Sequence, residues 1–565
     1  MRSQRRQHAI EQKLQNQENL LPRNRLIIVV TCMSLVMLLS VVDQNGISVT
    51  LPTIARDLDA ADTISWAGTS SLIANTVFCV LYGRLSDIFG RKSVFLTACI
   101  LLAVADLLCG LAQNAPMLYV FRALAGLSGG GLTSLTMIIV SDIVTLEERG
   151  KYQGIIGAMV GFGNVVGPFL AAGFSKSLTW RGFFWFLAPA LTISAVVAPR
   201  FLPSTKSDDN FWDGVRKIDW IGCFLSSGAI VLVLIPISGG GLYFQWDSPM
   251  VISMFVVGSC LFVAFLFYEW RVARLPMIPL QIFNSPCVAA LLAQSFLLGW
   301  SYQSLVYYLP QYYQNVRGYD TIVSAALSIP IVVMQSIFSI LSGQYISRRK
   351  RYGQVIWAGF FCWTLGSVIM TAVFGRSTHP AICVVALAII GAGVGNAFQP
   401  TLVALQVHSS KRHRAVVISA RNFCRACGGA FGLAASAGVL QASFRANLPP
   451  QDAELVNYVY ALPDTFEDSD RLLDAYMASI RNVFIMNTVV IGVCLLACVF
   501  VKDRGLQRSE SSDSSSLPYQ SSSTMVLGEE DKKPETGAIM GCESGSDSAS
   551  RLDKRNLDSE KAIIH

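Results

Sequence analysis

The stretch Gly83-Arg84-Leu85-Ser86-Asp87-Ile88-Phe89-Gly90-Arg91-Lys92 is a short polar break between two long apolar segments. Its glycines permit a tight turn and a close approach of neighbouring helices. Asp87 lies near the end of the preceding apolar segment, where it can pair with basic residues or with the N-terminus of a neighbouring helix. We therefore predict a conformational latch at this turn, built from Gly83, Asp87, Gly90, Arg91 and Lys92.

The segments on both sides of this break belong to a very apolar chain. Of its 565 residues, 52% are hydrophobic and only 14% are charged, whereas about a quarter of the residues of a soluble protein are charged. A helix that spans a bilayer needs roughly 20 apolar residues. This composition excludes a soluble enzyme with a membrane tail. It predicts an all-α polytopic membrane protein with 14 transmembrane helices, at residues 26–48, 64–82, 93–112, 117–140, 152–174, 182–202, 218–239, 249–270, 286–309, 322–345, 353–375, 381–406, 415–440 and 481–501.

The net charge of +7 would suggest a nucleic-acid partner in a soluble protein, but here the basic residues follow the loops. One set of alternate loops, with the N-terminus, holds 24 Lys and Arg residues, and the other set holds 8. Lys and Arg accumulate in the short cytoplasmic loops of membrane proteins. We therefore expect both termini in the cytoplasm, a lipid bilayer around the chain and no nucleic-acid partner.

The polar segments set the rest of the organisation. Residues 1–25 predict a basic cytoplasmic N-terminus. Residues 502–565 are rich in serine and charge and poor in aromatic residues, which is the composition of a disordered tail. Residues 441–480 predict a long acidic external loop, in which Leu472–Ile480 could form a short amphipathic helix.

The motifs exclude two other classes of protein. The string Gly90-Arg91-Lys92-Ser93 is the nearest approach to a phosphate-binding G-x-x-x-x-G-K-[S/T] loop, and it lacks the loop. The five histidines lie in loops, in tails or near helix ends, without metal-ligand spacing. We expect neither an ATP-driven pump nor an enzyme, and neither a metal nor a cofactor.

Four stretches resemble motifs of the major facilitator superfamily. Gly83–Lys92 resembles its loop-2/3 signature, and Leu118–Gly126 resembles its helix-4 motif with an intramembrane arginine. Gly163–Gly173 resembles the helix-5 antiporter motif, although two alanines stand where that motif usually ends in two glycines. Asp43–Pro52 resembles the helix-1 motif of the fourteen-helix drug:proton antiporters, although the residues after Asp43 differ.

The resemblance covers nearly all of residues 26–501 and implies a fold. That fold has two six-helix bundles, here 26–202 and 286–501, and a linker at 203–285 that carries two inserted transmembrane helices. A faint internal repeat agrees with it, because Gly343–Gly353 takes the place in the second half that the latch turn holds in the first. Fungal multidrug and toxin efflux transporters have this organisation.

Charged residues inside the membrane are functional candidates, because burying them is costly. A low dielectric favours the neutral form of a carboxyl group, so Asp43 could take up and release a proton; a structural hydrogen bond is the alternative. Asp106 offers a second titrating group, and contact with a polar partner is the alternative. The resemblance implies that Arg122 assists proton transfer near Asp43 and that Asp142 joins the latch, whereas a snorkelled arginine is the alternative for Arg122.

Small residues and a proline mark the fifth helix. Small residues let helix backbones approach closely, and a proline loosens the helical hydrogen-bond ladder. These residues are Gly157, Gly161, Gly163, Gly167 and Pro168, and we predict that they form a hinge against a helix of the opposite bundle. Close packing without motion explains the glycines about equally well.

Aromatic and amide side chains in the second half predict the substrate cavity, because transporter sites lie near the midplane between repeats. Such side chains suit medium-sized amphipathic organic molecules. Arg421 and Arg425 are four residues apart and share a helix face; they could attract anionic substrate groups or pair with acidic residues. The predicted cavity residues are Trp300, Gln303, Gln335, Asn396, Gln399 and Arg421.

These residues lead to one functional prediction and one alternative. The prediction is proton-driven export of drugs, toxins or secondary metabolites by alternating access, by a monomer in the plasma membrane. The alternative is a proton-coupled carrier for basic amino acids or siderophores, acting in uptake or in vacuolar sequestration. Because acidic cavity candidates are few beyond Asp43 and Asp106, hydrophobic or neutral cargo is favoured.

Overall fold

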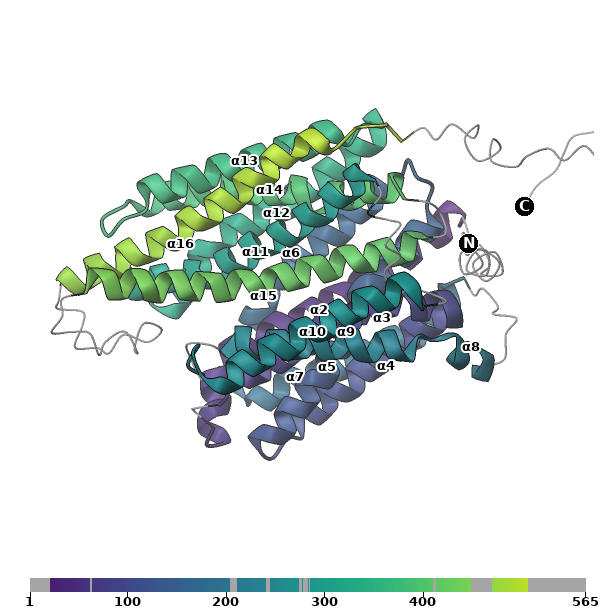
Figure 1. Cartoon of the computed structure of the whole chain (residues 1–565), viewed down its shortest axis with the longest axis horizontal. Helices are drawn as coiled ribbons and strands as arrows, with labels where there is room; N and C mark the ends of the chain where they lie inside the picture. The colour runs from purple at the N-terminus through teal and green to yellow at the C-terminus, as the bar shows by residue number, and fades with distance from the viewer. Residues whose placement is uncertain are drawn as a thin grey trace, which may run out of the picture. The chain divides into compact units, whose positions relative to one another are not determined.

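A computed structural model describes residues 21–60, 63–203, 211–239, 244–273, 277, 283, 285–409, 413–448 and 470–506. The predicted N-terminal segment up to residue 20, residues 449–469 of the predicted external loop and the predicted tail beyond residue 506 lie outside these ranges. Long α-helices make up most of the described chain (Figure 1).

The helices follow one another in three groups. The first group comprises α2 (Arg23–Asp57), α3 (Trp66–Phe89), α4 (Arg91–Gly110), α5 (Ala115–Ile143), α6 (Arg149–Ser177) and α7 (Trp180–Phe201). The second comprises α8 (Phe211–Lys217), α9 (Trp220–Gly239) and α10 (Pro249–Arg271). The third comprises α11 (Pro286–Gln311), α12 (Thr321–Arg349), α13 (Gly353–Val373), α14 (Pro380–Val407), α15 (Arg414–Asn447) and α16 (Asp470–Ala497).

Each of the fourteen predicted spans lies largely within one of these helices. Within the described ranges, thirteen helices are long and apolar enough to cross a membrane. The remaining predicted span lies in α11. This helix has 26 residues and is long enough to cross a membrane, but polar side chains such as Gln294 and Gln303 lower its hydropathy. The predicted short helix at Leu472–Ile480 is wrong as a separate element. It is the first part of α16, because the sequence holds no proline or glycine between Asp470 and Val490 that would break the helix.

Local sequence sets several helix starts. The Asn114 side chain accepts a hydrogen bond from Met117 N at 2.9 Å at the start of α5, where a proline also occupies the first turn. Thr179 caps α7 and Ser248 caps α10 in the same way. These side chains satisfy backbone N–H groups that have no partner within the helix.

The same pairing recurs in the first and third groups. In the first, α2 packs on α6, α3 on α5 and α4 on α7; in the third, α11 packs on α15, α12 on α14 and α13 on α16. Each group has its own apolar core, and we refer to them as the N-bundle and the C-bundle. The two bundles meet mainly where α6 packs on α12 and where α3 packs on α15.

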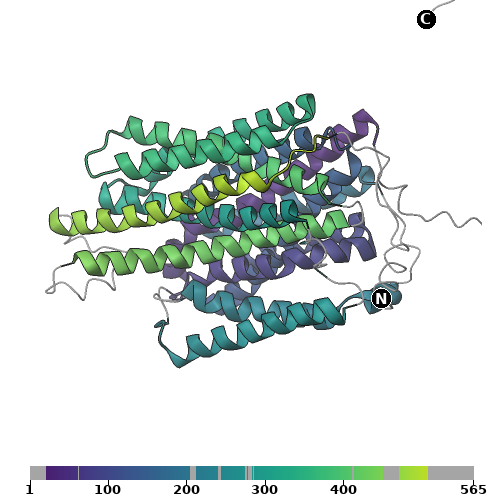
Figure 2. The ribbon, with the colours of Figure 1, turned by 45° about the horizontal axis from the view of Figure 1, so that its top comes forward.

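The helices α9 and α10 pack on each other, and α9 also packs on α3 and α15 (Figure 2). Large apolar side chains of α10 are exposed, among them Val256, Val263 and Phe267. In a membrane protein such side chains face lipid, which is as apolar as they are. The inserted pair therefore lies at the edge of the helix assembly.

Both ends of the described chain lie at the same end of the bundles as the latch turn. Leu21 N donates to Ile143 O, next to Asp142. After α16, Asp503 Oδ2 accepts a hydrogen bond from Gly353 N at 3.1 Å, at the start of α13. We call this end of the bundles, which carries Gly83–Lys92, the latch end.

Candidate functional site: a buried ion pair and an arginine cluster between two bundles

Asp43 of α2 and Arg122 of α5 form a buried ion pair inside the N-bundle. Arg122 Nη1 donates to Asp43 Oδ1 at 2.6 Å, and the two side chains are 0% and 1% exposed. The guanidinium also lies 3.5 Å from Ser71 Oγ of α3 and 5.8 Å from the ring centre of Phe184 of α7. Arg122 is therefore enclosed by neighbouring helices and does not snorkel. The structure brings the two predicted residues together, while their part in proton transfer stays a prediction.

Asp106 of α4 belongs to the same buried region. Its side chain is fully buried, and its carboxyl group faces that of Asp43. Asp43 and Arg122 are the charged groups that act on it electrostatically. Two buried carboxyl groups that face each other are far better tolerated when one of them is protonated. The three predicted proton-coupling residues thus form one cluster, with a single cation for two carboxyl groups.

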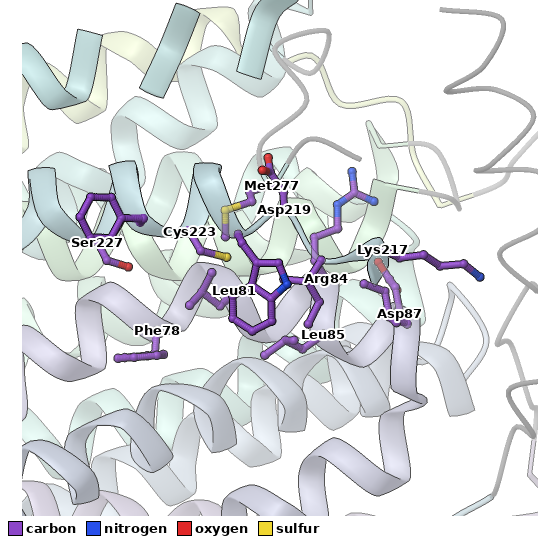
Figure 3. A pocket seen from close by; sticks show the side chains of 14 residues that line it. Phe78, Leu81, Arg84, Leu85, Asp87, Lys217, Asp219, Cys223, Ser227 and Met277 are labelled. Carbon is purple, nitrogen blue, oxygen red and sulfur yellow. The ribbon is translucent and has the colours of Figure 1, made fainter. Parts of the chain in front are cut away.

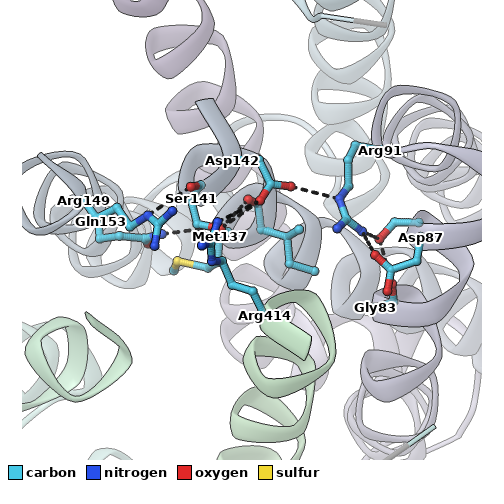
Figure 4. Close-up of polar contacts among 11 residues, drawn as sticks. Gly83, Asp87, Arg91, Met137, Ser141, Asp142, Arg149, Gln153 and Arg414 are labelled. Carbon is cyan, nitrogen blue, oxygen red and sulfur yellow. Dashed lines mark hydrogen bonds and ion pairs between the residues drawn. The ribbon is translucent and has the colours of Figure 1, made fainter. Parts of the chain in front are cut away.

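The predicted latch is a network at the ends of α3, α4 and α5 (Figure 4). Arg91 Nη1 lies 2.7 Å from Asp87 Oδ1, and Arg91 Nε donates to Asp142 Oδ2 at 3.0 Å. Gly90 alone joins α3 to α4 with φ 88° and ψ 143°, a conformation that is essentially restricted to glycine. Lys92 lies apart from these ion pairs and donates to Pro199 O of α7 at 2.6 Å.

The latch network continues into the C-bundle. Arg414 Nη1 of α15 lies 3.8 Å from the second oxygen of Asp142, Oδ1. Lys350, after α12, pairs with Glu147, after α5. Gly83 does not take part through charge: a Cβ atom there would lie 2.6 Å from Ser419 Oγ, so its glycine allows α3 to approach α15. These contacts hold the two bundles together at the latch end.

The glycines of α6 face two different helices. Cβ atoms at Gly163 and Gly167 would meet Val41 Cγ1 at 2.9 Å and Val42 O at 2.8 Å, so these glycines, which precede Pro168, pack on α2 of the same bundle. For these two glycines the predicted contact with the opposite bundle is therefore wrong. Gly157 and Gly161 do make it, since Cβ atoms there would lie 2.4 Å from Ser339 Oγ and 2.3 Å from Ser336 Oγ of α12. Gly154 also contacts α12, with a Cβ position 2.4 Å from Ser339 O. The sequence pattern could not distinguish the two faces, because glycines occur on both.

A chain of polar side chains joins the bundles. Asn45 of α2 donates to Asn164 of α6 at 3.1 Å, and Asn164 donates to Tyr302 of α11 at 3.0 Å. Tyr302 in turn donates to Gln335 of α12 at 3.0 Å. Only Gln335 was predicted as a cavity residue. The two asparagines lie within the helix-1 and helix-5 motifs, and their position beside each other became visible only in the fold.

Arg421 and Arg425 of α15 form the arginine cluster with Phe398 of α14 and Tyr302. The guanidinium groups lie 6.0 Å and 5.8 Å from the Phe398 ring centre, and the ring centres of Phe398 and Tyr302 are 5.1 Å apart. Arg421 also donates to Phe398 O at 2.6 Å. Asn422, next to Arg421, lies 3.4 Å from Ser134 Oγ of α5, so the cluster lies where the C-bundle meets the N-bundle.

The other predicted cavity residues separate into three places. Gln399 faces the N-bundle, since a Cβ atom at Gly157 of α6 would lie 2.7 Å from its side chain. Gln303 contacts α15 at Gly429, and Trp300 contacts α15 at Gly432. Asn396 packs against Gly359 of α13, away from the interface between the bundles. Gln335, Gln399 and Arg421 are thus the predicted residues that lie nearest the interface.

A pocket of about 490 Å³ lies elsewhere, between α3 and α9 (Figure 3). Its walls are mostly apolar, with Leu81, Cys223 and Met277 among them, and Arg84 and Asp87 at the latch end. None of the predicted cavity residues lines it. It belongs to the contact between the N-bundle and the inserted helices.

Known proteins resemble this chain over most of its length. The sequence profile described as "Major Facilitator Superfamily" matches residues 33–433. "Citrate exporter 1" of Yarrowia lipolytica is 50% identical over 88% of this chain and 75% of its own length. "MFS-type transporter clz4" of Cochliobolus lunatus is 45% identical over 87% and 89%, and "Efflux pump dotC" of Dothistroma septosporum is 32% identical over 72% and 70%.

A solved structure has the same fold at low sequence identity. The proton:xylose symporter XylE superposes with a TM-score of 0.57 at 14% identity, over 86% of this chain and 98% of that one.

Proposed function

This chain belongs to the major facilitator superfamily, and we propose that it exports a small organic molecule in exchange for protons. The relatives named as exporters and efflux pumps support the direction of transport. The observation that carries the proton coupling is the ion pair of Asp43 and Arg122, which lie 2.6 Å apart and are closed to solvent.

A proton can act as a switch at this pair. Protonation of Asp43 removes the negative charge, and Arg122 then remains buried without a counter-ion. A buried charge without its partner is strongly unfavourable, so the surrounding helices rearrange until the charge is solvated or paired again. Asp106 is the second carboxyl group within reach of Arg122. Proton uptake and release at this cluster can thereby drive the alternation of the bundles.

We propose that the latch end faces the cytoplasm, because the loops at that end hold most of the Lys and Arg residues. The contacts of Asp142 with Arg414 and of Glu147 with Lys350 then close the cytoplasmic side. During export these contacts break so that cargo can enter, and they form again before it leaves. We further propose a monomer in the plasma membrane.

The cargo is a small organic molecule. The predicted classes are drugs, toxins and secondary metabolites, and the citrate exporter among the relatives adds organic acids. Basic amino acids are disfavoured as cargo. The charged side chains beside Phe398, where the two bundles meet, are the two cations of the arginine cluster, and they would repel a cationic molecule.

The experiment uses the purified chain in liposomes that contain a pH-sensitive dye. A panel of candidate compounds is added to the wild type, to Asp43→Asn and to the matched control Asp57→Asn, an exposed carboxylate on the same helix. We expect compound-dependent proton movement in the wild type and the control, and its loss in Asp43→Asn.

Two outcomes contradict the proposal. Equal proton movement in Asp43→Asn would exclude Asp43 as the coupling group. Transport of labelled arginine or of an iron–siderophore, with no proton movement for any exported compound, would favour the alternative carrier.

A further inference from the structure

Two arginines of α15 in the C-bundle, Arg421 and Arg425, have no counter-ion among the described residues; Arg421 is buried and Arg425 is half-buried. Arg421 is 2% exposed and donates only to neutral acceptors, Asn422 Oδ1 at 3.1 Å and Phe398 O at 2.6 Å. For Arg425 the structure gives neither a hydrogen bond nor an ion pair with any described residue. The Nε atoms of both arginines are buried and unbonded.

No carboxylate among the described residues compensates these charges. The groups that act electrostatically on Arg425 are Cys79 and Tyr302, and those that act on Arg421 are Arg425, Cys79 and Cys424. The two cations are also four residues apart on one helix face, where like charges repel. This arrangement decides between the two roles that the sequence left open, since pairing with an acidic residue of the described chain is ruled out.

An arrangement of this kind is stable only if something else neutralises it. Burial of an unpaired charge costs far more than burial of a pair. By contrast, Arg122 in the N-bundle has Asp43 as its partner at 2.6 Å. The positive charge of the arginine cluster is therefore typical of a binding site in which the ligand supplies the negative charge.

The surroundings indicate the size and nature of that ligand. The Phe398 and Tyr302 rings provide an apolar wall beside the guanidinium groups. Cys79 of α3 and Ser134 of α5 approach the cluster from the N-bundle, so a ligand here contacts both bundles. Binding between the bundles is the arrangement that alternating access requires.

We propose that Arg421 and Arg425 bind the carboxylates of an organic anion with two or more carboxylate groups, and that this anion is the cargo. This inference rests on the proposed function. A guanidinium group presents paired donors that match a carboxylate in a bidentate geometry. Two of them on one face match a di- or tricarboxylate, whose carbon skeleton then lies against the aromatic wall.

The test is equilibrium binding of radiolabelled citrate to the purified full-length chain in detergent at pH 7. Unlabelled tricarballylate and succinate are expected to compete, whereas triethyl citrate, which has the same skeleton without charge, is not. Inorganic phosphate at the same concentration is expected to compete at least tenfold less well, because it offers nothing to the aromatic wall. Equal competition by the triester or by phosphate would overturn the proposal.

Variants locate the site. Arg421→Gln and Arg425→Gln each remove one charge-assisted contact, and we expect the affinity for citrate to fall about tenfold or more. Arg425→Lys keeps the charge but not the paired donors and is expected to lie between the wild type and Arg425→Gln. The matched control is Arg445→Gln, an exposed arginine on the same helix, for which we expect no change. Equal citrate affinity in all variants would overturn the assignment. The competition series uses only the wild-type protein, so it tests the proposal even if a variant fails to fold.

The same preparations separate this inference from the proposed function. If citrate binds through the arginines but moves no protons in liposomes, the anion site stands and proton coupling fails. If neutral compounds drive proton movement and no polycarboxylate binds, proton-coupled export stands and the anion site fails.

Discussion

Arg122 Nη1 lies 2.6 Å from Asp43 Oδ1, and solvent reaches neither side chain. Loss of one partner of a buried ion pair costs about 3–5 kcal/mol, because the other charge stays buried. We therefore expect Asp43→Asn and Arg122→Gln each to lower the melting temperature of the purified protein. The double variant Asp43→Asn/Arg122→Gln should melt above the less stable single variant. Strictly additive losses in the double variant would show that the two side chains do not act as a pair.

Asp106 behaves differently, because its carboxyl group is fully buried beside a second carboxyl group, that of Asp43. Asparagine has nearly the same shape and cannot become a second negative charge beside Asp43, so Asp106→Asn should melt at or above the wild-type temperature. If Asp106 carries a second proton, the number of protons moved per substrate in liposomes should fall in this variant. A ratio that matches the wild type would leave Asp43 as the sole coupling carboxylate of the cluster.

The approach of α6 to α12 at the latch end depends on glycine. A Cβ atom at Gly343 would lie 2.3 Å from Gly150 O, a backbone atom that has little freedom to move. We expect Gly343→Val to separate the bundles there, so that a short cross-linker no longer joins cysteines placed at Glu147 and Lys350. Gly173→Val is the control, since nothing lies within 4 Å of a Cβ atom at that position. Unchanged cross-linking in Gly343→Val would refute this account of closure.

Gly90 joins α3 to α4 with φ 88°. A residue with a Cβ atom is strained by about 1–3 kcal/mol in this region of backbone conformation. Gly90→Ala should therefore lower the melting temperature and reduce transport, because Asp87 and Arg91 flank this turn. Gly68→Ala, in a helix with open space around its Cβ position, should not destabilise the protein. A Gly90→Ala variant as stable as the wild type would mean that the turn adapts without strain.

The sequence by itself determined the helices, because a long apolar run in a bilayer can satisfy its backbone hydrogen bonds only as a helix. It also determined the latch turn, whose glycines and charges lie close together in the chain, and it indicated Asp43 and Arg122 as exceptional charges. It could not say which face of a membrane helix is buried. Lipid is as apolar as a protein core, so the sequence pattern does not distinguish the two sides.

Only the tertiary structure decided the contacts that depend on those faces. It turned Gly163 and Gly167 toward α2 and Gly154 toward α12. It brought Asp43 and Arg122 together across 79 residues of sequence. It also left Arg421 and Arg425 without a carboxylate among the described residues. Whether a buried charge is paired depends on every helix packed around it, and that information exists only once the bundles have assembled.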